Sequence, residues 1–168
     1  SKAVPEVITE SGGKALRSRV GHSYIKQMMA DQGAVFGGEH SGHFYFKDFW
    51  SADSGMLAAL HAIAALLESQ MKLSELMQSF NRYSLSGEIN TTVVDQGKAI
   101  EKINSYFKDY EPGLTFDKLD GLTVSAKNWW FNLRSSNTEP LLRLNVEADT
   151  PEQMVTMRDL VLQLIRNG

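Results

Sequence analysis

Apolar and polar positions in the first half of the chain alternate between helical and strand-like periods. The spacing predicts two helices, a strand in which apolar and polar residues alternate, and a short apolar run bounded by glycines that is typical of a buried strand. In chain order these are a helix at 5–11, a strand at 14–20, a helix at 24–31 and a buried strand at 34–36. Such an order is typical of an α/β unit.

A longer helix is predicted over residues 54–69, followed by another near 74–83. In the 54–69 helix, apolar residues recur at i, i+4, i+7 and i+11, so we expect this stripe to face a core. The stripe consists of Met56, Leu60, Ile63 and Leu67. This half then holds two convincing strands for about four helices, which is too little sheet for the helices to cover. We therefore expect part of the sheet to lie upstream of Ser1, and the absence of an initiator methionine fits a fragment or a processed chain.

The composition shifts near residues 85–87, where a β-branched run begins, and we place a domain boundary there. The predicted domains are residues 1–84 and 85–168. In the second, a strand (88–94) and a helix (96–110) precede strands at 122–126, 129–134 and 141–148 and a final helix that starts after Thr150. In the last strand Leu142, Leu144 and Val146 share one face. The fold class predicted is an incomplete three-layer α/β/α domain followed by an α+β domain with an antiparallel sheet and helices on one face.

The composition of the chain excludes or disfavours several classes of function. A net charge of -3 at pH 7 disfavours a nucleic-acid binder, which needs a basic face to neutralise phosphates. The chain has no cysteine, which removes disulfides and thiol chemistry, and no apolar run long enough to cross a bilayer. No signal peptide is visible at the N-terminus, so cytoplasm is the default location and no membrane partner is expected.

A polar loop between two predicted strands is the strongest local signal. Residues 134–140 read Arg-Ser-Ser-Asn-Thr-Glu-Pro. A phosphate dianion offers only acceptor oxygens, so a guanidinium fork, hydroxyls and amide donors suit it. Four residues supply these groups within five positions: Arg134, Ser136, Asn137 and Thr138. The alternative is a hairpin loop in which the serines and the asparagine only satisfy the backbone.

A second polar loop follows the apolar run at 34–36. Residues 37–43 read Gly-Gly-Glu-His-Ser-Gly-His. Ligands of α/β sheets lie beyond the carboxyl ends of strands, so the position suits recognition of a polyol, with Glu39 accepting from vicinal hydroxyls. The alternative is a glycine-rich turn with solvated histidines at 40 and 43. A metal site is disfavoured because the spacing matches no established zinc pattern.

A third cluster lies where the 14–20 segment turns into a helix. It contains Arg17, Arg19, Gly21 and His22. The helix N-terminus favours an anion there. Taken alone, however, the arginines are better interpreted as an exposed strand face and His22 as a structural cap. Of Trp129 and Trp130, at least one is expected to pack into the core, because adjacent strand residues face opposite sides.

The two polar loops, in this order and about ninety residues apart, resemble the α-D-phosphohexomutases. The segment Val20-Gly21-His22-Ser23 adds a third match, and the resemblance covers nearly the whole chain, as most of domain three and all of domain four. The Gly-Glu-x-Ser-Gly-His form is characteristic of the bacterial phosphomannomutase/phosphoglucomutase branch. Asn137, where the aminosugar branch more often has glycine, leans the same way.

The resemblance implies a role for each motif. Glu39, Ser41 and His43 would contact sugar hydroxyls, Gly21 and His22 would lie by the reacting phosphoryl group, and His22 is the candidate general acid/base. Arg134, Ser136, Asn137 and Thr138 would hold the non-reacting phosphate, with closure at a hinge near residues 84–87.

The family moves a phosphoryl group between O1 and O6 of a hexose through a phosphoserine enzyme and a bisphosphorylated sugar, with Mg²⁺ neutralising charge. The serine loop and the aspartate-rich metal loop belong to domains one and two, and neither motif occurs here. The resemblance thus implies a hexose phosphate substrate, Mg²⁺ bound outside this chain, a glucose 1,6-bisphosphate-type activator, and the missing domains as partners. Alone, the chain is expected to be inactive as a mutase. Phosphoglucosamine mutase and a non-catalytic sugar-phosphate binding module remain alternatives.

Overall fold

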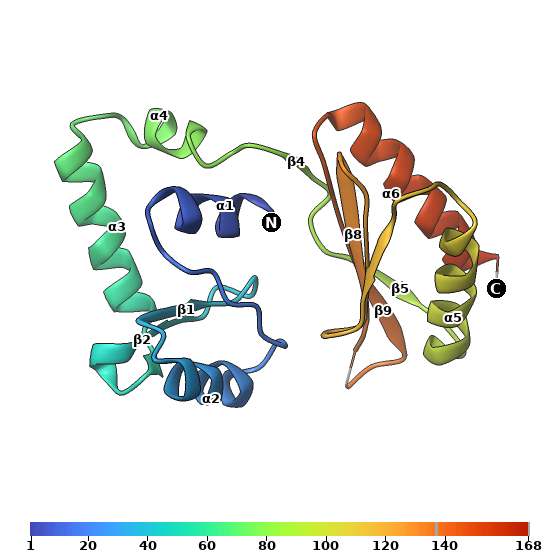
Figure 1. Ribbon diagram of the computed structural model, residues 1–168, viewed down its shortest axis with the longest axis horizontal. Helices are drawn as coiled ribbons and strands as arrows, with labels where there is room; N and C mark the ends of the chain where they lie inside the picture. The colour runs from blue at the N-terminus through green and yellow to red at the C-terminus, as the bar shows by residue number, and fades with distance from the viewer. Residues whose placement is uncertain (137, 168) are drawn as a thin grey trace. The chain divides into compact units, whose positions relative to one another are not determined.

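The computed structural model describes residues 1–136 and 138–167. The chain forms two compact units (Figure 1). We call Val7–Asn81 the α/β unit, and Ser1–Glu6 together with Arg82–Gly168 the α+β unit. Helix α1 (Ala3–Glu10) therefore begins in the α+β unit and ends in the α/β unit. No helix of the described residues is long and apolar enough to span a membrane.

The α/β unit is built on a small antiparallel sheet with the order β1-β2-β3. Its strands are β1 (Phe36–Gly38), β2 (Phe44–Phe46) and β3 (Ala52–Asp53), with a 3-10 turn, η1 (Lys47–Phe49), before β3. The helices are α2 (His22–Gln32), α3 (Gly55–Ser69) and α4 (Leu73–Gln78). The three-layer α/β/α class expected for this half is confirmed.

Successive residues of the strands face different helices. Tyr45 packs with Ile25 and Met29 of α2 in a small buried cluster. Gly37, the strand partner of Tyr45, has no room for a side chain, because an added Cβ would lie 2.9 Å from Cγ2 of Ile25. On the opposite face, Phe46 stacks on His61 of α3 with 5.3 Å between ring centroids. The small sheet thus lies between two helices, with α2 on one face and α3 on the other.

Three expectations for this unit are wrong. Residues 14–20 form no strand, and no described residue pairs with them in a ladder. The short strand begins at Phe36 instead of Ala34, and Phe36 is half exposed rather than buried. The apolar stripe of α3 does not face a core within the described residues. Its exposed fractions are Met56 78%, Leu60 56%, Ile63 54% and Leu67 73%.

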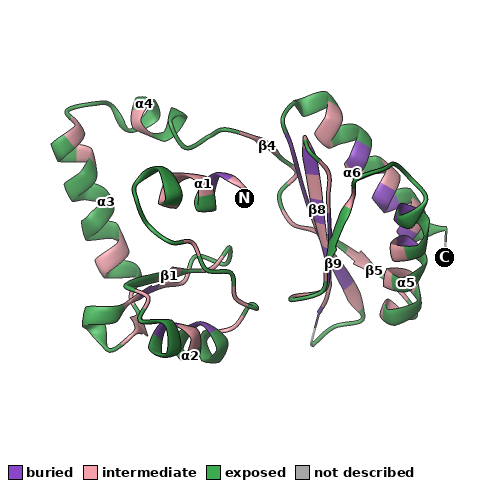
Figure 2. Ribbon diagram, viewed as in Figure 1, coloured by how far each residue is buried: buried purple, intermediate pink, exposed green. Residues whose placement is uncertain are grey.

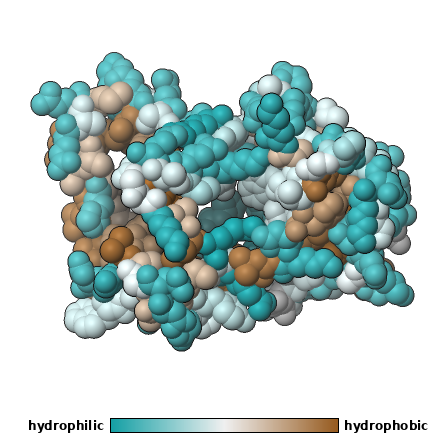
Figure 3. All heavy atoms as spheres, viewed as in Figure 1, coloured by the Kyte–Doolittle hydropathy of each residue, from teal (hydrophilic) through white to brown (hydrophobic). Residues whose placement is uncertain are grey.

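The stripe is exposed because no described element covers that side of α3. The helix contains no buried residue in the part of the chain that the structure describes (Figure 2). In the space-filling view, hydrophobic residues gather where α3 and β2 lie in Figure 1 (Figure 3). The periodicity predicted the helix and its apolar stripe correctly, but not what packs against that stripe.

The α+β unit has a six-stranded antiparallel sheet, in which β4-β9-β8-β7-β6 follow one another and β5 also pairs with β9. The strands are β4 (Ser84–Leu85), β5 (Ile89–Thr92), β6 (Thr115–Asp117), β7 (Leu122–Ser125), β8 (Trp129–Ser135) and β9 (Leu141–Ala148). Helices α5 (Gln96–Lys108) and α6 (Pro151–Arg166) complete it. The α+β class expected for this half is confirmed.

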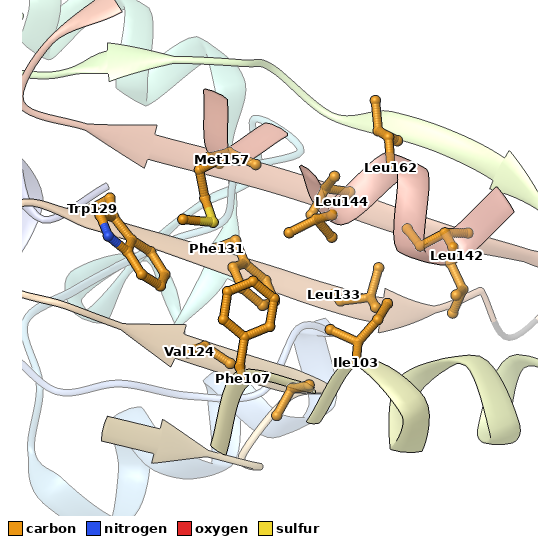
Figure 4. Close-up of a cluster of buried hydrophobic side chains, with 14 of the residues drawn as sticks. Ile103, Phe107, Val124, Trp129, Phe131, Leu133, Leu142, Leu144, Met157 and Leu162 are labelled. Carbon is orange, nitrogen blue, oxygen red and sulfur yellow. The ribbon is translucent and has the colours of Figure 1, made fainter. Parts of the chain in front are cut away.

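Both helices pack on one face of this sheet and form the main core (Figure 4). Leu142, Leu144 and Val146 are at most 2% exposed, as the alternation in β9 predicts. Phe107 of α5 is fully buried, with its ring centroid 4.9 Å from that of Phe131. Trp129 joins this core, as expected for one of the two tryptophans.

The opposite face of the sheet is polar and holds the start of the chain at one end. Glu147 is 1% exposed and accepts hydrogen bonds at Oε1 from the Lys2 backbone amide and from Nε1 of Trp130, each at 2.8 Å. Nζ of Lys2 donates to the carbonyl of Ala126 at 3.2 Å. Glu6 contacts Arg82 and Tyr83. These contacts explain why the first six residues belong to the α+β unit.

Candidate functional site

The loop between β1 and β2 is closed by its own backbone. The Glu39 amide donates to the His43 carbonyl at 2.9 Å, and the Gly42 amide donates to the Glu39 carbonyl at 3.0 Å. Gly42 has φ +85°, a left-handed conformation that favours glycine. The loop therefore presents Ser41 to solvent between Glu39 and His43, the three residues expected to read hydroxyls.

Asp53 of β3 orients His43. Its Oδ2 lies 2.6 Å from Nδ1 of His43, and its Oδ1 accepts from the Phe44 amide at 2.9 Å. A carboxylate only accepts, so Nδ1 carries the hydrogen and Nε2 is left for a ligand. The hydrogen bond to Asp53 and then its charge raise the pKa of His43 above 6.5. The same bond, with the Phe44 amide, lowers the pKa of Asp53 below 3.8.

Replacing Asp53 with asparagine is expected to lower the pKa of His43, because the carboxylate charge is lost. In the native chain the pair adds stability below the ordinary histidine pKa and loses it as pH rises through the raised pKa of His43. At the acid end it loses stability as pH falls through the lowered pKa of Asp53. An NMR titration of the His43 ring measures the midpoint. Asp48→Asn is the matched control, and an unchanged midpoint in D53N would contradict the assignment.

The side chain of Glu39 is held by a hydrogen bond from the buried Tyr45. The Tyr45 hydroxyl donates a short hydrogen bond to Oε1 of Glu39. Burial, and then this bond, raise the pKa of Tyr45 above 10.0, so the phenol stays protonated and acts as the donor. The carboxylate of Glu39 is thereby fixed on one side, with the other oxygen directed away from this bond.

His22 lies at the first position of α2, next to the same loop. Its ring centroid is 6.1 Å from that of His43 in an edge arrangement. Gly21 is the N-cap with φ +126°, a conformation that few other residues adopt. The structure thus brings together His22, His43 and Asp53. The positive charges of the two histidines also lower the pKa of Asp53, after the hydrogen bonds described above.

A cavity of about 230 Å³ adjoins this loop. Glu39 and His40 line it together with Arg17 and Arg19. The guanidinium of Arg19 also lies 4.8 Å from the centre of the Tyr24 ring. The third cluster of the sequence is therefore placed beside the second, and it adds positive charge to a pocket that already holds a carboxylate.

Arg134 lies in the α+β unit at the end of β8. Its Nη2 is 3.4 Å from Oε2 of Glu88, and Nη1 of Arg143 is 3.2 Å from Oε1 of the same carboxylate. Arg134 and Arg143 are direct partners across β8 and β9, an arrangement in which like charges repel. Glu88 between them offsets this repulsion. The three side chains together carry one net positive charge and suit an anion.

The loop after Arg134 is tied to helix α5. Gln96 donates through Nε2 to the carbonyls of Glu139 at 2.9 Å and Leu141 at 3.0 Å. Ser136 is 8% exposed, and its Oγ accepts from the Thr138 amide at 3.4 Å. The fourth residue predicted for this loop, Asn137, lies outside the described residues. The side chains of Arg134, Ser136 and Thr138 are thus carried by a loop that a distant glutamine holds in place.

Sequence reasoning missed the residues that position the site. These are Asp53, Tyr45, Glu88, Arg143 and Gln96. Only Arg143 left a signal, since it lies on the polar face of an alternating strand. The others meet their partners through tertiary structure alone.

Comparison with known proteins gives a consistent result for both units. Residues 1–83 match the family profile "Phosphoglucomutase/phosphomannomutase, alpha/beta/alpha domain III". Residues 88–164 match the profile "Phosphoglucomutase/phosphomannomutase, C-terminal domain". The chain belongs to the phosphoglucomutase/phosphomannomutase family and carries its domain III and its C-terminal domain.

Individual relatives agree. A phosphomannomutase of Methanocaldococcus jannaschii is 47% identical over 165 residues, which is 98% of this chain and 36% of the relative. A phosphomannomutase of Escherichia coli K12 is 37% identical over 162 residues, or 95% of this chain and 35% of the relative. A crystal structure of a family protein from Burkholderia thailandensis superimposes with a TM-score of 0.79 at 26% identity, covering 98% of this chain and 36% of that one. The chain spans about a third of the length of the relatives it matches.

Proposed function

We propose that this chain is the substrate-binding C-terminal part of a phosphohexomutase that interconverts hexose 1-phosphate and hexose 6-phosphate. In the proposed reaction a phosphoserine enzyme and a bisphosphorylated sugar are the intermediates, and a glucose 1,6-bisphosphate-type activator primes the cycle. The observation that carries the proposal is the position of Arg134, which lies next to last in strand β8, opposite a second arginine, just before a loop that Gln96 holds by hydrogen bonds. Mannose and glucose are the proposed sugars, and the phosphomannomutase relatives favour them over glucosamine.

Each of the two domains predicted from the sequence has its own part in this proposal. Residues 1–84 form the sugar-recognising domain, in which Glu39, Ser41 and His43 bind ring hydroxyls. Gly21 and His22 serve the reacting end, with His22 as general acid/base. Residues 85–168 form the phosphate-binding domain, in which Arg134, Ser136, Asn137 and Thr138 hold the non-reacting phosphate. A fixed grip on one phosphate lets binding energy position the other.

Magnesium belongs to the proposed reaction but not to the described part of this chain. Among the described residues, no three histidine, aspartate or glutamate side chains are placed so that they could hold one metal ion, the neighbouring His22, His43 and Asp53 included. The residues present therefore do not fit a magnesium site. When bound elsewhere in the enzyme, Mg²⁺ would neutralise charge that develops on the transferring phosphoryl group.

The proposal is tested with this chain and two simple probes. In NMR titrations, inorganic phosphate is expected to shift the amides around Arg134 and Ser136, whereas methyl α-D-mannoside is expected to shift those of residues 39–43. Mannose 1-phosphate should shift both sets and bind more tightly than either probe. Shifts confined to other surfaces would contradict the proposed function, and so would mutase turnover by the chain alone.

A further inference from the structure

Tyr45 occupies a position that packing alone would give to phenylalanine. Its ring is fully buried, and its neighbours in the small core of the α/β unit are Ile25 and Met29. The adjacent residues of β2, Phe44 and Phe46, are both phenylalanines. The hydroxyl of Tyr45 therefore needs an explanation beyond filling space, because a buried hydroxyl is costly unless it is hydrogen-bonded.

The hydroxyl finds its partner at the candidate site. It donates to Oε1 of Glu39, which comes directly after β1. Tyr45 lies in β2 and pairs with Gly37 of β1, two residues before Glu39 in the same hairpin. Gly37 allows this arrangement, because an added Cβ there would lie 2.9 Å from Cγ2 of Ile25 and 3.2 Å from Sδ of Met29, the residues that pack around Tyr45. Gly37, Tyr45 and Glu39 thus connect the small core of the α/β unit to the candidate site at its surface.

We propose that Tyr45 is a positioning residue, which fixes the Glu39 carboxylate through Oε1 and so presents Oε2 to a ring hydroxyl of the substrate. The inference rests on the proposed function of Glu39. A glutamate side chain loses up to about 2 kcal/mol of rotamer freedom when it is fixed. Tyr45 removes part of this cost before the sugar arrives, so binding to the sugar is strengthened without any contact between Tyr45 and the substrate.

The proposal specifies hydroxyl recognition and not phosphate recognition. Tyr45→Phe deletes a single oxygen and keeps the ring that fills the core. We expect this change to raise the Kd for mannose 1-phosphate about 10-fold, since hydrogen bonds to charged groups contribute at the upper end of the usual range. The Kd for inorganic phosphate should not change. Resistance to urea should fall by less than a large-to-small core substitution would cause.

A double-mutant cycle separates positioning from packing. Glu39→Ala removes the carboxylate that Tyr45 is proposed to orient, and the double variant should then bind mannose 1-phosphate no more weakly than Glu39→Ala alone. Tyr106→Phe, at an exposed tyrosine of α5, is the matched control and should leave both affinities unchanged. Additive effects of the two changes would overturn the proposal.

The possible failures are distinguishable. If the wild-type chain does not bind mannose 1-phosphate, the proposed function fails and the role of Tyr45 fails with it. If the wild-type chain binds and Tyr45→Phe binds equally well or more tightly, only the positioning role is overturned. A 10-fold loss that disappears in the Glu39→Ala background would establish it.

Discussion

Replacing Arg134 with alanine is expected to weaken the binding of inorganic phosphate to this chain by about 10- to 100-fold, the range for a lost charge-assisted hydrogen bond. The guanidinium is the one group of the loop that carries positive charge, and its side chain is only 23% exposed. Glu88 keeps Arg143 as a partner in the variant, so no carboxylate is left unpaired by the change. Calorimetry with phosphate measures the effect.

Lysine at the same position provides an intermediate test. Arg134→Lys keeps the charge but loses the two-pronged geometry, so its affinity should lie between those of the wild type and Arg134→Ala. The matched control is Arg158→Ala, which removes an arginine paired with Asp159 on the surface of α6. Equal phosphate binding by the wild type and Arg134→Ala would contradict the assignment of this loop.

Replacing Gly121 with alanine is expected to destabilise the α+β unit by about 2 to 5 kcal/mol, since it combines backbone strain with overpacking. Gly121 has φ +74°, and an added Cβ would lie 2.5 Å from the Leu133 carbonyl oxygen. It would also lie 2.9 Å from Cα of Arg134. The strand that carries Arg134 must shift to make room, so phosphate affinity should fall together with stability.

Gly113 separates the two causes. It has φ +83° but nothing within 4 Å of an added Cβ, so Gly113→Ala introduces strain without collision and should cost about 1 kcal/mol. Urea unfolding followed by tryptophan fluorescence, in a Trp50→Phe background that leaves only Trp129 and Trp130, reports on this unit. Equal losses in the two variants would show that the close approach of Gly121 to the Arg134 strand has no energetic consequence.

The sequence predicted the α+β unit better than the α/β unit, for a physical reason. The alternation in β9 has its partners within the chain: Leu144 faces the helices, and Arg143 faces the polar side. The short strand β6 was missed, because three residues are too few to show a period. In the α/β unit, the apolar stripe of α3 predicted burial, but burial depends on what lies opposite the helix.

The candidate site shows the same division. The loops containing Glu39 and Arg134 were recognised from residue types that suit hydroxyls and phosphate. Their supports were not, because Asp53 and Gln96 reach them only through the fold, from β3 and α5. Residue type reveals which groups can touch a ligand, whereas the tertiary contacts reveal which groups hold them still.

The anchoring of the first residues beside β9 matters to anyone who divides this protein into pieces. A gene fragment that starts at residue 82 or 85 would omit the Lys2 amide, which donates to the buried carboxylate of Glu147. Oε2 of Glu147 already has no hydrogen-bond partner among the described residues. The shortened piece would therefore bury this carboxylate with Trp130 as its remaining donor, which is costly. Supplying residues 1–6 as a separate peptide, or changing Glu147 to glutamine, is the corresponding remedy.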